Sequence, residues 1–537
     1  MLACSRVTPT CTSGYRSRFS CRAEDQQTQN STGLIVQNKK KKKVLVVGSG
    51  WAGLGAAYHL CKQGFDVTVL EGGYDSGLTR LASSPDDFGI RGFWYPYRNI
   101  FNLVDELGIK PFTNWIKSAQ YSGEGLEVEF PIFQDLPQWP TPFGTLFYTE
   151  FARLPLVDRL TSLPLMAAVV DFDNTDTSWR KYDASKSNWS FSDIPWGLPS
   201  LDEILLFQQC EFHFVVTARE LFRQFRSSER LFENVLNPLL QVGLFAPAER
   251  CSAAATLGML YYFVLAHQKD FDLVWCRGTV REKIFEPWMD SMGNQGCKFL
   301  EGRRVTDFYF DEETGRISEV ICGKESLKAD AVILAVGIST LQEIIQNREE
   351  FLKVLNLSSI DLLSVKLKLD KKVNIPFASN ACSGIDNSNG WTFFDLNAIY
   401  DEHKDDPETV IQADFFHANE LLPLKDEDVV AKAMSCLSKC IKNFEDATVI
   451  DKEIARFPTY SRLLYMCICN SVVQCQEKSF VTGLEAANRV VDYLEEGTFA
   501  RIIPVEEDEP HIQALRSLNR NLNEIIAQLP WSNYFIQ

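Results

Sequence analysis

The sequence predicts an α/β fold built on a Rossmann-type nucleotide-binding unit, and three consecutive features predict it. Residues 44–47 are an uninterrupted apolar run, which is typical of a central parallel strand covered on both faces. A glycine-rich turn at 48–53 follows this run directly. The chain then continues through a helix-like stretch into a second strand-like alternation, which ends at the acid Glu71.

The residue types in this unit each have a physical reason. Gly48 permits the tight turn, Gly50 lets the backbone approach a pyrophosphate, and Gly53 lets the following helix pack closely on the sheet. Phosphate charge would then meet the N-terminus of that helix. Glu71 stands about 20 residues after the glycines, where a carboxylate accepts a hydrogen bond from a ribose hydroxyl. The pattern predicts a dinucleotide site and leaves open whether FAD or NAD fills it.

Composition and charge narrow the class of protein. The chain has 537 residues, which suggests about two to four structural units. A hydrophobic content of 45%, with 12% aromatic residues, is typical of a folded globular protein with a large core. The net charge of -17 would repel phosphate backbones, so we expect no nucleic-acid partner. The oligomeric state stays open.

Cysteine and histidine spacing predicts no metal site. The 15 cysteines are scattered and lack the paired spacing of a zinc site, so we expect reduced, mostly buried thiols. Cys436 and Cys440 are at helical spacing, and we expect neither a metal nor a disulfide there. His267 is expected to be structural. The longest apolar run, 253–266, is shorter than the roughly 20 residues that span a bilayer, so it predicts a buried core helix and no transmembrane span.

The N-terminal segment has the composition of an organelle-import sequence. Residues 1–23 contain no acid, and their arginines are interleaved with serine and threonine. A continuous apolar stretch, as in a secretory signal, is missing from this segment. We therefore expect a transit peptide for the plastid, with the mitochondrion as the weaker alternative and an ordinary disordered tail as the other interpretation.

Further segments carry a family resemblance, namely 77–80, 88–99, 103–109, 302–306, 329–337 and 478–490. Together with the glycine turn, they are similar to the flavin amine oxidase superfamily and, within it, to carotenoid desaturases such as zeta-carotene and phytoene desaturase. The resemblance extends over most of the chain after the N-terminal segment. It implies an FAD cofactor and an FAD-dependent oxidoreductase that dehydrogenates or isomerises a hydrophobic, polyene-like substrate.

The resemblance also implies roles for single residues. Arg80 is then the basic residue of a second glycine motif, Val305 touches the adenine through its backbone, and Gly483 lies in the final flavin-contacting helix. The candidate cofactor-binding residues are therefore Gly48, Ser49, Gly50, Ala52, Gly53, Glu71, Arg80, Val305 and Gly483. No catalytic side chain is assigned, because the flavin ring itself carries out hydride chemistry.

One segment departs from the family pattern. In the family, a strand that ends in Gly-Asp precedes the final flavin helix, but residues 466–475 contain neither glycine nor aspartate. Two other functions stay open, the first because of this departure and the second because the glycine motif alone does not choose between FAD and NAD. One is a catalytically impaired homologue that acts as a binding or scaffold protein. The other is an NAD-dependent dehydrogenase in which Glu71 binds the NAD ribose.

The resemblance implies a Rossmann-type (GR2-like) FAD-binding domain with an inserted α+β substrate domain, built on a mixed sheet and helices. We expect the FAD-binding domain at 41–110, 271–340 and a shortened 456–500, and the substrate domain at 111–270 and 341–455. Residues 1–40 are the leader and 501–537 a C-terminal amphipathic helix.

Three elements are expected within these domains. Gly278 opens a helix that runs through Trp288, residues 302–306 begin a strand, and residues 365–369 alternate as a half-buried strand.

Two segments suit contact with apolar partners. The stretch 131–170 is rich in aromatic residues, which would suit the entrance of a site for a hydrophobic substrate, although ordinary core packing is the stronger interpretation. Examples are Phe133, Trp139, Phe143, Phe147 and Phe151. After Pro510, apolar residues at steps of three and four predict an amphipathic helix that docks on its own protein. Shallow membrane attachment is the alternative, and the acids at 506–509 argue against it on anionic lipid.

Overall fold

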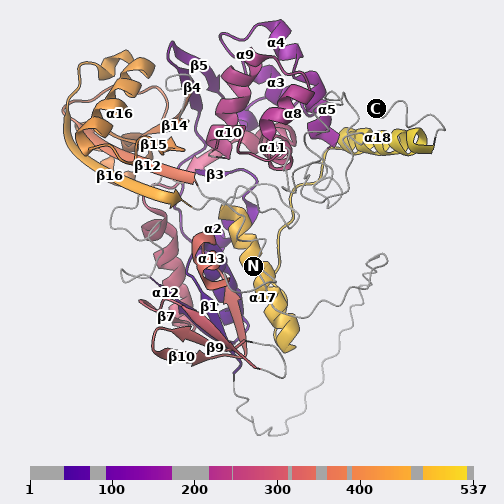
Figure 1. Ribbon diagram of the computed structural model, residues 1–537, viewed down its shortest axis with the longest axis vertical. Coiled ribbons are helices and arrows are strands. Elements are labelled where there is room, and N and C mark those ends of the chain that lie inside the picture. Colours follow the sequence, from indigo (N-terminus) through magenta and orange to yellow (C-terminus); the bar gives the residue numbers. More distant parts are fainter. Residues whose placement is uncertain are drawn as a thin grey trace, which may run out of the picture.

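The computed structural model describes residues 41–72, 92–171, 217–244, 246–311, 317–345, 360–383, 390–460 and 476–528. One parallel and one larger mixed sheet dominate it, and helices from distant parts of the chain cover them (Figure 1). The expected transit peptide, Arg80 and the segment 466–475 lie outside the described residues. The mixed α/β architecture agrees with the predicted fold class.

The parallel sheet has the strand order β11-β1-β2-β7. Its strands are β1 (Lys43–Val47), β2 (Asp66–Leu70), β7 (Lys298–Leu300) and β11 (Ala331–Leu334). Val44 and Val46 of β1 pack in the core that contains α1 (Trp51–Lys62), whereas Leu45 and Val47 pack in a second core on the other face. Burial on both faces explains why this strand is apolar at every position, as predicted.

A small antiparallel sheet contributes to the second core. It consists of β8 (Asp307–Phe310), β9 (Ile317–Cys322) and β10 (Glu325–Lys328). The expectation that residues 302–306 begin a strand was wrong, because they form the connection between β7 and β8. Gly302 has a left-handed φ of 64°, which turns the chain out of the ladder after β7.

The larger sheet has seven strands in the order β16-β12-β15-β14-β13-β4-β5. They are β4 (Ser118–Ser122), β5 (Gly125–Phe130), β12 (Ile360–Leu369), β13 (Ser379–Cys382), β14 (Trp391–Asp395), β15 (Val410–Phe416) and β16 (Val449–Tyr460). All neighbours are antiparallel except β13 and β4. In β12, Val365 and Leu367 are fully buried and Lys366 is partly exposed, which confirms the predicted half-buried strand.

Helices cover both sheets. The helix α16 (Asp426–Cys440) lies on one face of the seven-stranded sheet (Figure 1), while α17 (Gln476–Leu494) packs along α1 beside the parallel sheet. The expected core helix at 253–266 is confirmed, since α11 (Ala253–Met259) is buried along its whole length and continues as the π-helix η4 (Leu260–Leu265). Further elements are α2 (Arg98–Leu107), α3 (Phe143–Tyr148), α4 (Leu156–Leu160), α5 (Leu163–Asp171), α8 (Ala218–Gln224), α9 (Glu229–Leu231), α10 (Asn237–Gly243), α13 (Ile338–Ile345), α15 (Leu396–Ile399), β3 (Gly92–Trp94) and β6 (Leu273–Trp275).

The helix expected from Gly278 to Trp288 starts later and ends later. A π-helix, η6 (Arg281–Phe285), leads into α12 (Glu286–Asn294). Pro287 lies in the first turn of α12 and has no N–H to donate, so the preceding turn loses an ordinary helical hydrogen bond and widens.

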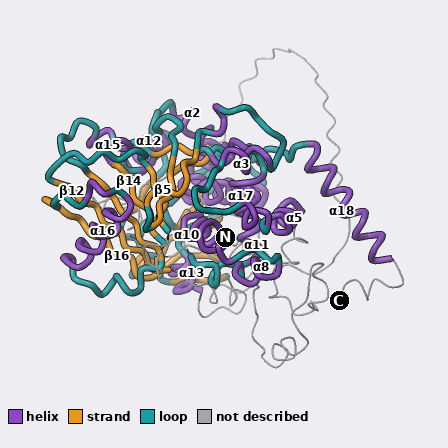
Figure 2. The backbone as a smooth tube through the Cα atoms, turned by 90° about the horizontal axis from the view of Figure 1, so that it is seen from above, coloured by secondary structure: helices purple, strands orange, loops and turns teal. Residues whose placement is uncertain are grey.

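The chain ends, within the described residues, in the amphipathic helix α18 (Pro510–Gln528). Figures 1 and 2 show that α18 extends away from the body of the molecule. Ile512 and Arg516, one turn apart, are buried, and the Arg516 guanidinium lies 4.6 Å from the centre of the Tyr261 ring, so the first two turns of α18 pack on the protein. Leu515 and Leu518 are exposed. No helix in the described part of the chain is long and apolar enough to cross a membrane.

Candidate functional site

The glycine turn lies where β1, β2 and β11 end. Gly48 has a φ of 102° and donates its N–H to the Leu70 carbonyl, 2.8 Å away. A Cβ atom at Gly48 would lie 2.4 Å from the carbonyl oxygen of Ala335, the residue after β11. Both the backbone conformation and the available space therefore require glycine here.

The other two glycines differ in what surrounds them. A Cβ atom at Gly53 would lie 1.9 Å from the Gly48 carbonyl oxygen, so the start of α1 is packed against the turn itself. By contrast, a Cβ atom at Gly50 would have no heavy atom within 4 Å. Gly50 is the N-cap of α1, and its end of the helix has no side-chain cap. The turn thus leaves an open cradle at a helix N-terminus, which is suited to a phosphate.

Glu71 lies against the same turn. It follows β2 directly, and its side chain is only 8% exposed. One carboxylate oxygen accepts hydrogen bonds from Ser49, from the hydroxyl at 2.6 Å and from the backbone N–H at 3.3 Å. The structure therefore brings Ser49 and Glu71 together, as a shared nucleotide site requires. An ionised carboxylate at this position can accept hydrogen bonds from hydroxyl groups of a ribose.

Val305 lies on a connection that borders Glu71. The backbone of Glu71 donates to the Leu300 carbonyl at 2.9 Å and accepts from the Arg303 N–H at 2.8 Å. The Val305 side chain is buried in the core formed with Leu70 and the sheet β8–β10. Because the side chain points into this core, only the backbone of Val305 is left to face a ligand.

Gly483 supports the glycine turn from outside. A Cβ atom at Gly483 would lie 2.1 Å from the carbonyl oxygen of Ala52, in the first turn of α1. Phe480, one turn earlier on α17, fills the space above Gly55 in the same way. The structure therefore brings Gly483 and Ala52 together, in close packing of α17 on α1.

A buried acid at the start of α17 was missed from the sequence. Glu477 accepts hydrogen bonds from the Asn99 N–H at 2.8 Å, the Asn99 side-chain amide at 2.7 Å and the Ile100 N–H at 2.9 Å. These N–H groups belong to the first turn of α2, which its own residues leave uncapped. Burial raises the pKa of Glu477, and the N–H donors oppose this rise. The only signal in the sequence was the position of this acid, because Glu477 directly precedes the segment 478–490 that resembles the flavin-contacting helix.

Residues 498–509, the C-terminal strap, connect α17 to α18 across the molecule. The Thr498 carbonyl accepts a hydrogen bond from His59 of α1 at 2.8 Å. Ile503 exchanges two backbone hydrogen bonds with the side-chain amide of Asn99, at 2.7 and 2.9 Å. Asn99 therefore holds the strap and Glu477 at the same time.

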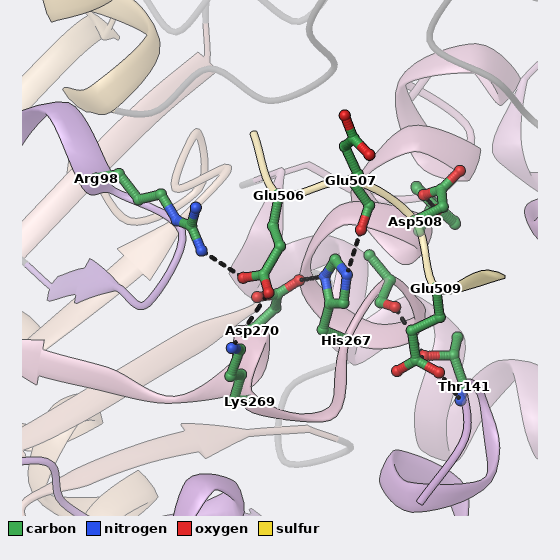
Figure 3. Close-up of polar contacts among 11 residues, drawn as sticks. Arg98, Thr141, His267, Lys269, Asp270, Glu506, Glu507, Asp508 and Glu509 are labelled. Carbon is green, nitrogen blue, oxygen red and sulfur yellow. Dashed lines mark hydrogen bonds and ion pairs between the residues drawn. The ribbon is translucent and has the colours of Figure 1, made fainter. Parts of the chain in front are cut away.

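The acidic part of the strap is paired with cationic and hydroxyl groups (Figure 3). Glu506 forms an ion pair with Arg98 of α2 and a second one with Lys269, at 3.4 Å. Glu509 accepts from the Thr141 hydroxyl at 3.1 Å and from its N–H at 3.2 Å. These acids therefore face the protein itself.

His267 lies behind the strap and is structural, as expected. Its Nδ1 is 2.9 Å from the Asp270 carboxylate, and its Nε2 is 3.0 Å from the Glu507 carbonyl (Figure 3). Burial lowers the pKa of His267, but Asp270, Glu506 and the Glu507 carbonyl together raise it above its usual value.

The aromatic stretch divides into buried and exposed residues. Phe133 is fully buried, whereas Phe143 and Phe147 of α3 are 62% and 65% exposed and Trp139 is 48% exposed. Core packing therefore does not explain the last three. Nearby on α4 and at the start of α5, Val157, Leu160 and Leu163 are exposed as well.

Comparison with known proteins places these features in a family. A family model described as flavin containing amine oxidoreductase matches residues 51–459. Carotenoid phi-ring synthase of Chlorobaculum tepidum is 22% identical over 320 residues, which cover 58% of this chain and 44% of that protein. Zeta-carotene desaturase, chloroplastic/chromoplastic, of Capsicum annuum is 26% identical over 204 residues, covering 35% and 34%. The matched region is thus less than half the length of either relative.

A solved structure supports the fold independently. Cyclohexylamine oxidase from Brevibacterium oxydans superimposes with a TM-score of 0.56 at 14% identity, over 85% of this chain and all of the other. Because the sequence identity is so low, this likeness shows a shared fold and nothing about function. The family match covers most of the chain, from the start of α1 to β16. The protein therefore belongs to the family of flavin-containing amine oxidoreductases.

Proposed function

We propose that this protein is an FAD-dependent oxidoreductase that dehydrogenates or isomerises a hydrophobic, polyene-like substrate. Family membership indicates a flavin and does not favour the NAD-dependent alternative. The observation that carries the proposal is the open cradle at Gly50, at the uncapped N-terminus of α1. A flavin bound there supplies the hydride acceptor, and the protein supplies binding and exclusion of water.

The residues present fit the nucleotide part of FAD. Gly50 leaves room for the pyrophosphate, and the N–H groups of the first turn of α1 provide its partners. Glu71 lies beside the turn, where it would accept from the ribose. Val305 comes shortly after Arg303, whose N–H donates to the Glu71 carbonyl, and the Val305 backbone would contact the adenine. Ser49, Ala52, Gly53 and Gly483 complete the proposed site by shaping the turn, and Arg80 is included on the family resemblance.

The strands of the two main sheets support the proposed division into domains. The parallel sheet takes strands from 41–110 and 271–340, and α17 from 456–500 packs on α1, which supports a flavin domain built from three stretches. The seven-stranded sheet takes its strands from 118–130 and 360–460, which supports an inserted substrate domain. The boundaries themselves stay a proposal.

A hydrophobic substrate is supported by two observations. The two curated relatives carry carotenoid-related names, and residues 139–163 expose six large apolar side chains, here called the apolar face, namely Trp139, Phe143, Phe147, Val157, Leu160 and Leu163. We propose that this face receives the substrate, through shallow contact with the lipid phase that dissolves it. A plastid location is supported by the composition of residues 1–23 and by the chloroplastic relative.

The first experiment is an absorption spectrum of the purified chain without residues 1–23, with heat release to identify bound dinucleotide. We expect about one FAD per chain, and flavin bleaching when an apolar polyene is added as reductant. The Gly50→Ala variant should bind FAD at least tenfold more weakly, because its methyl group enters the cradle, while the thermal stability of its apoprotein is unchanged.

The matched control is Gly293→Ala, which is also surrounded by open space but lies far along α12. It should retain FAD. A folded and colourless wild-type protein would reject the proposal and favour a binding or scaffold protein that has lost its cofactor. Equal FAD content in Gly50→Ala and wild type would reject the proposal that the open space at Gly50 receives the pyrophosphate.

A further inference from the structure

Two thiols from distant parts of the chain meet under the seven-stranded sheet. Cys382 is the last residue of β13, and Cys440 is the last residue of α16. Their Sγ atoms are 3.7 Å apart, although the residues are 58 positions apart in the chain. Both cysteines are reduced. A disulfide needs the sulfur atoms to approach to about 2 Å, so the two side chains must move closer together before the bond forms.

The two thiols share one core but differ in how deeply they are buried. Both lie in the apolar core between the sheet and α16, together with Tyr121 and Cys436. Cys382 is 1% exposed and Cys440 is 7% exposed, so Cys440 is the less deeply buried of the two residues. Burial raises the pKa of the Cys382 thiol well above its usual value, so this thiol stays protonated.

We propose that Cys382 and Cys440 form a disulfide when the protein meets hydrogen peroxide. The Cys440 sulfur attacks one peroxide oxygen, the O–O bond breaks, and a sulfenic acid and one water result. The Cys382 sulfur then attacks the Cys440 sulfur, the S–O bond breaks, and the hydroxyl leaves with the thiol proton as a second water. Two thiols lose two electrons in total, and one peroxide is reduced to two waters.

The bond would fasten α16 to the sheet that it covers. The loop closed by Cys382 and Cys440 contains β14, β15 and α16, so the cross-link restricts this segment in the unfolded chain. Because the two thiols lie in a core separate from that of α1 and α17, the flavin content should not depend on their oxidation state. This modification is therefore independent of the proposed activity.

The test is peptide mapping after slow oxidation of the folded protein. The full chain is incubated for hours with dilute hydrogen peroxide, because burial slows access, then denatured in a thiol-blocking reagent and digested with trypsin. Cleavage after lysine places Cys382 in the peptide 373–404 and Cys440 in the peptide 440–442, while Cys436 falls in 433–439. We expect a linked peptide pair 373–404 with 440–442 in most chains, and a melting temperature about 5 °C above that of the reduced protein.

The controls separate this pair from general oxidation. Cys436→Ala should still give the linked pair and the higher melting temperature, whereas Cys382→Ala should give neither. The proposal is overturned if peptides 373–404 and 440–442 are recovered separately with blocked or over-oxidised sulfurs, or if Cys440 is found linked to Cys436. It is also overturned if Cys382→Ala is stabilised by peroxide as much as the wild type.

Discussion

The carboxylate of Glu477 accepts two hydrogen bonds from Asn99, although the two residues are 378 positions apart in the chain. Through this contact, the first turn of α17 caps the first turn of α2. Asn99 also holds the C-terminal strap at Ile503. The buried side-chain amide of Asn99 therefore joins α2 and α17, two helices of the proposed flavin domain, to the C-terminal strap.

Replacing Glu477 by glutamine should destabilise the protein by about 2 kcal/mol. A glutamine keeps the shape of the side chain but presents an NH2 group to a backbone N–H of α2, which leaves a buried donor unsatisfied. Urea unfolding followed by circular dichroism measures the change. The control is Glu485→Gln on the same helix, which should have little effect. Equal stability of the two variants would contradict the capping role.

Replacing Gly483 by alanine should cost about 3 kcal/mol or more, because the new methyl group would overlap the Ala52 carbonyl oxygen. The displaced α17 should also shift the start of α1 and weaken FAD binding. Gly293→Ala provides the opposite case, since this helical glycine has open space around it and alanine favours helix by up to about 1 kcal/mol. Thermal melting of both variants, with and without added FAD, tests the difference.

Asp272 should make stability fall with rising pH. Burial raises its pKa from the usual 3.8 to about 6, although the backbone N–H groups of Phe133 and Gln134 donate to it. The protonated form is favoured in the folded protein, so this contribution is full below pH 3.8 and is lost as the pH rises through 6. Between pH 5 and pH 7.5, the free energy of unfolding should drop by about 1 kcal/mol relative to Asp272→Asn. Parallel pH profiles for the two proteins would show that Asp272 does not titrate in this range.

The exposed apolar face should bind lipid. Changing Phe143 and Phe147 together to serine removes two largely exposed aromatic side chains, each worth about 2 kcal/mol when buried in an apolar phase. We expect co-sedimentation with neutral phosphatidylcholine vesicles to fall at least fivefold, with the fold and the FAD content unchanged. Tyr309→Ser is the control, because Tyr309 is 61% exposed but lies on β8. If the double variant sediments like the wild type, this face does not contact lipid.

Local sequence pattern was sufficient for the nucleotide-binding unit. The strand, turn and helix around Gly48 and Gly53 are consecutive, and the need for glycine comes from backbone contacts within that short stretch and with the end of β11. Glu71 could be placed because a single strand separates it from the helix. Where a local fold depends on neighbours in sequence, the residues that form it are recognisable from their order.

Contacts between distant segments had no such signal. The parallel pairing of β13 with β4 joins residues more than 250 positions apart, so the order of the seven-stranded sheet could not be predicted. Cys440 is at helical spacing from Cys436, and no bond was expected there, whereas its sulfur lies 3.7 Å from that of Cys382, at the end of the distant strand β13. Phe147 is apolar enough for a core position, and only its place on the outside of α3 leaves it exposed.

Glu506 should hold the C-terminal strap locally without supporting the whole fold. Its two ion pairs, with Arg98 and Lys269, involve side chains that are about one third exposed, so each is worth at most about 1 kcal/mol. Glu506→Gln should therefore leave the melting temperature nearly unchanged but increase hydrogen exchange of residues 498–509 about threefold to fivefold. Added salt should bring the wild type toward the variant, because it screens the same charges. Glu495→Gln, just outside the strap and exposed, should exchange like the wild type. Exchange that is unchanged in Glu506→Gln and insensitive to salt would show that the hydrogen bonds of Asn99 and Thr141 hold the strap by themselves.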